Sequence, residues 1–544
     1  MTERSSRPSG VTIALAVIVA IGALLRWLSP GRIALWRDEA QYLAIASLPD
    51  VQSIVSFLYR HESHPPLYYL LGRAAQAVFG TVEGPMAALS ALASVAVIAV
   101  VGTVGSRAFS PAAGLIAASA TALSMPLVIL TVQLRPYALL ALLVLVSHSS
   151  LWAYWSGRGE RWLYVWFGST VLIPYLHHVS VLILAGQAII VGWLQWRGMP
   201  LERFRWRKLL QHATLLALLA IPSGYLLLAQ ATTAAYPSPK PFSILRPFLA
   251  LGVLSLSFPL ELLLPLLVLL AAGLGLLSRT RRVPVFDGAR PLLTAATPVF
   301  LLLATLATYR SQFLVPHLLL SMAPFGMLLA GAYIAGTAAA GRRLQAAVWG
   351  EAVVTMVVIG FLFATGFAKT NTDLVARSVA AAAHPDDLIV LVPGAAGASF
   401  NRYFTGSNSR IDFPAVGQTP LYKFDADFAR ISDPRALQMA RDSVRAAFDG
   451  GRRVWLVTID RWVNSRVPTP ELLSRDSFGG LGQADRSRAN RLERYARWLY
   501  GPPAQIMTTD TTLPAYEQLV ARLYARKPDM KLRTSDSALA RDDE

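Results

Sequence analysis

Cysteine is absent from this chain, and charged residues are scarce. None of the 544 residues is Cys, which excludes disulfides, thiolate catalysis and cysteine-ligated zinc or iron–sulfur centres. Only 15% of the residues are Asp, Glu, Lys or Arg, whereas a soluble domain has about 25%. Because 54% of the residues are hydrophobic, the composition indicates an integral membrane protein.

Acidic residues are the scarcest charged type in the first 368 residues. That part holds 25 basic and 11 acidic residues, a balance of +14 of the total +18. The basic residues fall in short clusters between apolar runs, as the positive-inside rule expects of cytoplasmic loops. The charge therefore reports membrane topology, and it does not indicate a nucleic-acid partner.

Long apolar runs predict about 11 transmembrane helices, since a helix needs about 20 apolar residues to cross the hydrocarbon core. The first run lacks a small-x-small cleavage site and is expected to stay as an anchor. The N-terminus is predicted to be cytoplasmic and the C-terminus exterior. The composition is typical of bacteria, so the expected location is a bacterial inner membrane. The predicted spans are 11–29, 84–106, 112–132, 137–155, 162–177, 178–196, 209–230, 255–278, 291–309, 315–338 and 346–368.

This topology divides the chain into a membrane domain, 1–368, and an exterior domain, 369–544. The membrane domain has a long first exterior loop, 30–83, and a second exterior loop, 231–247, which we expect to be mobile and to close over a ligand. In the exterior domain "DDLIVLVPG" and "RRVWLVTID" are predicted strands. Between them lies a predicted helix with Asp433 as its N-cap and Pro434 in its first turn. The tail is therefore predicted to be a small α/β domain.

The first exterior loop collects the acids of the membrane half. Five of the 11 lie between residues 38 and 83. Asp38 and Tyr42 are four residues apart and share a face if this segment is helical. A carboxylate at the membrane edge is expected to have a raised pKa, which suits a general base. The alternative is that these acids solvate a loop or pair with Arg32 and Arg37.

A second stretch of this loop, "HESHPPLYYLLGR", places Glu62 and His64 before a double proline. The prolines fix the backbone where the chain returns to the membrane. Glu62 and His64 are therefore expected at a defined place near the exterior surface. The alternative interpretation is a simple helix start.

These stretches, in order with "QLRPYALLALL", "YLHHVSVLIL", "QFLVPHLLLSMAP" and "RRVWLV", resemble the membrane-embedded C-type glycosyltransferases over essentially the whole chain. The resemblance is to the bacterial branch related to protein O-mannosyltransferases and lipid A aminoarabinose transferases. Two departures are Gln133, where many relatives carry an acid, and Gln312-Phe313, where relatives often have Arg-Tyr. Neither branch assigns the sugar.

The resemblance implies an inverting transfer of a sugar from a polyprenyl-phosphate donor to an acceptor hydroxyl at the exterior face. The acceptor is a glycan, a lipid or a protein. Asp38 would be the base, and Glu39, Tyr42 and Glu62 would position the acceptor, although Glu39 and Glu62 could instead hold His64 or bind a metal. Arg135 is either a phosphate contact or a structural partner of the first-loop acids. The implied phosphate-binding residues are His64, Arg135, Tyr137, His177, Lys240, Arg246 and Arg310.

No cofactor is expected from this resemblance, and a divalent cation would have Asp38, Glu39 and His64 as its ligands if one were bound. The competing interpretation is a transporter or flippase of lipid-linked sugars. Against it, the sequence has no inverted repeat, and its acids gather on one side of the membrane, whereas transport sites lie near the midplane.

Overall fold

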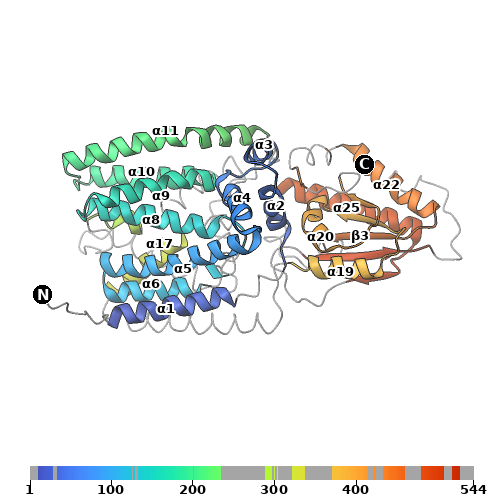
Figure 1. Ribbon diagram of the computed structural model, residues 1–544, viewed down its shortest axis with the longest axis horizontal. Helices are drawn as coiled ribbons and strands as arrows, with labels where there is room; N and C mark the ends of the chain where they lie inside the picture. Colours follow the sequence, from blue (N-terminus) through green and yellow to red (C-terminus); the bar gives the residue numbers. More distant parts are fainter. Residues whose placement is uncertain are drawn as a thin grey trace.

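The computed structural model describes residues 10–28, 34–124, 127–128, 133–199, 201–233, 288–296, 299, 303, 322–336, 370–414, 421–423, 430, 433–459, 479–507 and 518–526. Within these ranges a helical bundle and a sheet-containing unit lie at opposite ends of the molecule, and three short helices lie between them (Figure 1). Figure 1 shows the long bundle helices side by side, nearly parallel to the long axis.

The bundle contains long apolar helices that match the predicted spans of the first half of the chain. In the described part of the chain, four helices are long and apolar enough to cross a membrane: α1 (Gly10–Trp27), α5 (Glu83–Ala108), α8 (Tyr137–Trp155) and α11 (Arg203–Thr233). Several helices of this length and composition indicate a multi-pass membrane protein. The other bundle helices are α6 (Pro111–Leu123), α9 (Arg161–Leu176), α10 (Ser180–Trp196), α14 (Pro291–Thr294) and α17 (Ala323–Gly336). The predicted spans 255–278 and 346–368 lie outside the described residues, so the total of about 11 stays a prediction.

Small residues let the bundle helices approach closely, as in other membrane bundles. A side chain at Gly105 in α5 would meet the Gly114 backbone of α6 at 2.8 Å, and one at Gly331 in α17 would meet the Ala113 carbonyl at 2.5 Å. Without an apolar driving force between helices in lipid, such contact supplies much of the packing energy. The core formed around these helices extends to the first loop.

The first loop is helical over most of its length. It forms α2 (Arg37–Ala46), α3 (Val51–His61) and α4 (Leu67–Phe79). The Asp50 side chain caps α3 by accepting the Ser53 N–H at 2.7 Å. The α4 helix follows the double proline and ends at Gly80, whose φ of 71° is the left-handed conformation that glycine adopts without strain. Asp38 and Tyr42 are therefore on one helix, which meets the condition under which their four-residue spacing places them on one face.

The C-terminal unit contains a five-stranded sheet of order β2-β1-β3-β5-β4. Its strands are β1 (Leu388–Val392), β2 (Arg410–Asp412), β3 (Val454–Ile459), β4 (Gln505–Met507) and β5 (Leu519–Tyr524). Strand β1 is parallel to its neighbours β2 and β3, and β5 is antiparallel to β3 and β4. Its helices are α19 (Thr372–Ala382), α20 (Gly397–Tyr403), α22 (Pro434–Asp449) and α25 (Gly479–Tyr500).

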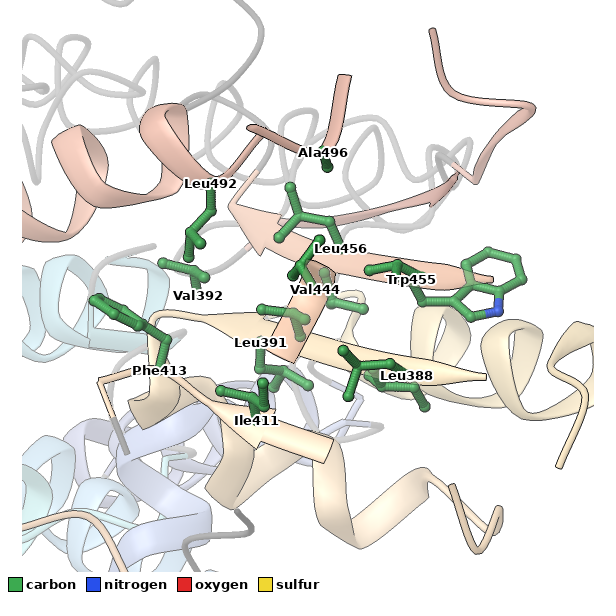
Figure 2. Packing of buried hydrophobic residues seen from close by; sticks show 14 of the residues in the cluster. Leu388, Leu391, Val392, Ile411, Phe413, Val444, Trp455, Leu456, Leu492 and Ala496 are labelled. Carbon is green, nitrogen blue, oxygen red and sulfur yellow. The ribbon is translucent and has the colours of Figure 1, made fainter. Parts of the chain in front are cut away.

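The predicted β-α-β arrangement in this unit is present. The two predicted strands are β1 and β3, and Leu388 pairs with Val454 in parallel register. The predicted helix is α22, and the Asp433 side chain accepts the Arg435 N–H at 2.9 Å as its N-cap. The core of the unit packs side chains of the central strands against α22 and α25 (Figure 2). Its largest member is Trp455, which is 0% exposed.

The C-terminal unit contacts the first loop directly. Tyr403 at the end of α20 accepts the Leu35 N–H at 2.9 Å through its hydroxyl oxygen. The Gln41 side chain on α2 donates to the Tyr422 carbonyl at 2.7 Å and accepts the Tyr422 N–H at 3.0 Å. These bonds hold α2 between the bundle and the sheet.

Candidate active site

Glu39 fixes the start of α2 to the loop that precedes α8. It is fully buried, at 0% exposure. Its Oε2 accepts the Trp36 N–H at 3.3 Å, and its Oε1 accepts the Leu134 N–H at 2.8 Å. Both donors are backbone N–H groups, one at the start of a helix and one in a loop, and neither position supplies a regular backbone acceptor. This geometry makes Glu39 a structural link between α2 and residues 133–136, a role that was not among those predicted for it.

Asp38, the neighbour of Glu39, lies on the accessible side of α2. Its side chain is 28% exposed, and Oδ1 accepts a hydrogen bond from the Arg37 Nε at 3.1 Å. Among the described residues its Oδ2 has no hydrogen-bond donor, so this oxygen is able to accept a proton. Burial raises the pKa of Asp38, but the charges of Arg37 and Arg135 outweigh it and hold that pKa below its ordinary value. The prediction of a raised pKa for Asp38 is therefore wrong. Because its pKa is lowered, the Asp38 carboxylate is ionised at neutral pH.

Glu62, His64 and Arg135 form a hydrogen-bonded row beside Asp38. The His64 Nδ1 lies 3.0 Å from the Glu62 Oε1, and the His64 Nε2 lies 2.9 Å from a terminal nitrogen of Arg135. Because a guanidinium cannot accept a hydrogen bond, Nε2 must be the acceptor, and Nδ1 carries the hydrogen that is donated to Glu62. Of the roles left open for Glu62, this contact fits that of holding His64.

The row keeps Glu62 ionised although it is only 7% exposed. Burial raises its pKa, but hydrogen bonding to His64 and the Ser63 N–H, together with the Arg135 charge, lowers it below the ordinary value. Arg135 thus lowers the pKa of both Asp38 and Glu62. Its described side-chain hydrogen bonds, however, go to His64 and Tyr137 and not to a carboxylate.

Arg135 has hydrogen-bonding capacity to spare. The residue is 6% exposed, and its buried Nε has no hydrogen-bond partner among the described residues. Its guanidinium carbon lies 5.9 Å from the Tyr137 ring centre, a cation–π distance. A buried guanidinium with an unused N–H is costly to leave unpaired, so the arrangement favours an anionic ligand here.

A small cavity lies beside this row. Its volume is about 10 Å³, about the space that one water molecule needs. A substrate the size of a sugar therefore requires the walls to move. Burial raises the pKa of Tyr69 in the wall, so its hydroxyl keeps its proton. The walls are formed by Tyr42, His64, Pro65, Tyr68, Tyr69, Arg135, Pro136 and Leu176.

Of the two adjacent histidines, His177 is the one nearer to the row. It follows α9, and its ring centre lies 5.6 Å from that of His64 and 6.2 Å from that of Tyr137. His178 instead bonds to Gln230 at 2.5 Å, and Gln230 also donates to the Leu58 carbonyl at 2.8 Å. Gln230 therefore links α11 to α3, and His178 attaches the turn between α9 and α10 to Gln230.

The structure brings together eight of the predicted site residues: Asp38, Glu39, Tyr42, Glu62, His64, Arg135, Tyr137 and His177. Lys240, Arg246 and Arg310 lie outside the described residues, as does most of the predicted mobile loop 231–247.

The conditional metal ligands Asp38, Glu39 and His64 do not fit a divalent ion here. Both His64 nitrogens bond to protein groups, and both Glu39 oxygens accept backbone N–H groups. In the described part of the chain no three His, Asp or Glu side chains are grouped as metal ligands.

Several residues of the site were not predicted from the sequence as site residues. Tyr68 and Tyr69 face the cavity, and the Tyr42 hydroxyl donates to the Tyr68 carbonyl at 3.2 Å. Gly72 in the next turn is needed because any side chain there would collide with the Tyr42 hydroxyl. The signal available was the aromatic pair directly after the prolines of "HPPLYY".

The arrangement can perform three chemical tasks. The carboxylate of Asp38 can accept a proton, the Arg135 guanidinium can bind an anion, and the tyrosine-rich walls can exclude water. Together these tasks suit a displacement in which a hydroxyl attacks and an anionic group leaves.

The fold is shared with solved structures of ArnT from Cupriavidus metallidurans. The apo structure aligns with a TM-score of 0.51 and 13% identity over 85% of this chain and 95% of that chain. The structure bound to undecaprenyl phosphate aligns with a TM-score of 0.50 and 13% identity over 94% of this chain and 97% of that one. No protein-family model and no curated protein matches the chain. The predicted fold of the C-type membrane glycosyltransferases is therefore confirmed.

Proposed function

We propose that this chain, with the fold of the C-type membrane glycosyltransferases, is an inverting glycosyltransferase. It would move a sugar from a polyprenyl-phosphate donor to an acceptor hydroxyl. The observation that carries the proposal is the arrangement of two side chains in one site. Asp38 is a part-exposed carboxylate, and the nearby Arg135 is a buried guanidinium with an unused N–H. The undecaprenyl phosphate bound to an ArnT structure of this fold supports the choice of donor.

In this proposal Asp38 is the base. Its Oδ2 takes the acceptor proton while the acceptor oxygen attacks the anomeric carbon from the face opposite the phosphate. The bond from that carbon to the phosphate oxygen breaks, and its electron pair leaves with the phosphate. The products are the inverted glycoside and polyprenyl phosphate. The lowered pKa keeps Asp38 ionised at neutral pH, as a base must be.

Arg135 would hold the donor phosphate. Negative charge grows on the leaving phosphate in the transition state, and a fixed cation in a water-poor site stabilises that charge. His64 would align the guanidinium, because its Nε2 accepts one Arg135 N–H and leaves others free. His177 and Tyr137 lie next to this pair and would complete the phosphate pocket with their polar atoms.

The orientation in the membrane is part of the proposal. The site would face the exterior, the N-terminus the cytoplasm, and the C-terminal unit the periplasm of a bacterial inner membrane. The contacts of Gln41 and Leu35 with the C-terminal unit support a role for that unit in presenting the acceptor to α2. We propose no specific sugar.

The test is Asp38→Asn in purified protein, assayed with a radiolabelled polyprenyl-phosphate sugar. Asparagine keeps the size of the side chain but cannot take the proton. Loss of general-base catalysis predicts a fall in turnover of about 10² to 10⁴ with donor binding retained. The matched control is Asp50→Asn in the same loop, because the amide oxygen still caps α3 and turnover should not change.

Turnover by Asp38→Asn at the parental rate would refute the assignment of the base. Movement of the intact lipid-linked sugar across the bilayer, with no glycoside formed in either protein, would instead favour a flippase.

A further inference from the structure

The end of the bundle opposite the candidate site carries a dense basic surface. The α8 helix links the two ends, since it starts at Tyr137 beside Arg135 and ends at Trp155. Nineteen helical residues rise about 28 Å, close to the thickness of a bilayer hydrocarbon core. We call the described residues of 107–110, 156–161, 197–208 and 288–290 the basic belt. It holds nine basic and two acidic residues.

Hydrogen bonds join the loops of the basic belt into one surface. Arg158 donates to the Arg107 carbonyl at 3.2 Å, which joins the loop after α8 to the end of α5. Arg290 donates to the Ala108 carbonyl at 2.9 Å, next to the same helix end. The Tyr154 hydroxyl donates to the Arg205 carbonyl at 2.9 Å, which attaches the start of α11. The basic side chains of these loops therefore lie on one continuous surface.

Aromatic rings lie beneath many of these cations. Such stacking holds a guanidinium flat on a ring and leaves its edge N–H groups facing outward. The guanidinium-to-ring distances are 4.5 Å for Arg158 over Trp152, 5.2 Å for Arg205 over Tyr154 and 5.5 Å for Arg197 over Trp193. The edges of these groups match phosphate oxygens in geometry.

Apolar side chains project outward directly beside the basic belt. Trp196 is 79% exposed and Phe204 is 60% exposed, and Leu218 on the same helix as Phe204 is 57% exposed. Exposed aromatic rings between a charged rim and an apolar helix surface are typical of the level at which lipid headgroups lie. A soluble polyanion would match the charges but not these apolar neighbours.

We propose that the basic belt binds the phosphate groups of anionic phospholipids. The stacked arginines contact the phosphate, and the exposed rings and α11 contact the adjoining acyl chains. This surface is separate from the candidate site and does not depend on the proposed transferase activity.

The test measures lipid binding to the full-length protein after delipidation in detergent. Phosphatidylglycerol and phosphatidylcholine with identical acyl chains are titrated separately, and bound lipids are counted by native mass spectrometry. We expect phosphatidylglycerol to bind more tightly, with an affinity that falls as salt rises. Equal affinity for the two lipids would overturn the proposal without any variant.

Three exposed arginines of the basic belt give a matched substitution test: Arg158→Gln, Arg161→Gln and Arg197→Gln together. Each basic residue near an anionic membrane surface contributes about 1 kcal/mol, so the affinity for phosphatidylglycerol should fall on the order of 100-fold. The control removes the same charge from the C-terminal unit, with Arg435→Gln, Arg494→Gln and Arg526→Gln. An unchanged affinity in the belt variant, or an equal loss in the control, would overturn the proposal.

Discussion

The Arg135→Gln variant tests two roles of Arg135 in the candidate site, anion binding and control of the pKa of Asp38. The structure assigns Arg135 two effects: it offers unused N–H groups to an anion, and it lowers the pKa of Asp38. A hydrogen bond to a charged group contributes about 1.5 to 3 kcal/mol. Removing one from the donor phosphate should therefore weaken donor binding about 10- to 150-fold.

The same variant should shift the pH dependence. Asp38 acts as a base only when ionised, so activity is lost as the pH falls through its pKa. An opposite charge nearby lowers a carboxyl pKa by about 1 to 3. Without Arg135 the pKa of Asp38 rises, and the acidic limb of the pH profile of kcat/KM should move up by on the order of one pH unit.

Arg37→Gln is the matched control, because Arg37 also lowers the pKa of Asp38 and contacts it at 3.1 Å but is not a wall of the cavity. It should move the acidic limb in the same direction and leave donor binding unchanged. The assay is the donor dissociation constant together with kcat/KM from neutral pH down to below about pH 4, because the acidic limb of the parent lies below the ordinary pKa of an Asp. Equal donor affinities in the two variants would refute the phosphate-binding role of Arg135.

Two further predictions concern the C-terminal unit. Gln41→Ala removes both bonds to Tyr422 and should lower kcat for acceptor transfer about 5- to 100-fold, while donor affinity, measured by titration, stays the same. Asp387→Asn weakens a part-buried pair with Arg453 and a bond to Trp455, and should lower the free energy of unfolding by about 1.5 to 3 kcal/mol in a denaturant titration. Burial raises the pKa of Asp387, but its bonds lower it overall, so the stabilisation is present above the unfolded-state pKa and is lost as the pH falls through the folded-state pKa. An Asp387→Asn difference from the parent that stayed constant down to low pH would contradict this account.

Local patterns predicted much of the fold because their causes lie within a few residues. The N-cap Asp433 and the buried strand runs are of this kind, and the structure bears them out. The membrane spans of the first half follow from apolar length. The shared face of Asp38 and Tyr42 was expected only if their segment is helical, and α2 meets that condition.

The electrostatics of the site depend on contacts between distant parts of the sequence, and these were not predictable. Arg135 is 71 residues from His64, and nothing in either local sequence specifies their 2.9 Å contact. The pKa of Asp38 was assigned the wrong direction because the prediction followed its membrane-edge position, whereas pairing with the adjacent Arg37 was kept only as the alternative. The link from Gln41 to Tyr422 spans 381 positions and depends on how two separately folded regions meet.

The bridge made by Glu39 limits how this protein can admit a bulky molecule. The Glu39 carboxylate accepts hydrogen bonds from the start of α2 and from the Leu134 backbone. These bonds join the segment that carries Asp38 to the segment that carries Arg135. The distance between these two segments cannot increase unless the hydrogen bonds of Glu39 break. Room for a substrate is therefore expected to come from the other walls of the cavity, which Tyr68 and Tyr69 of α4 and Leu176 of α9 form.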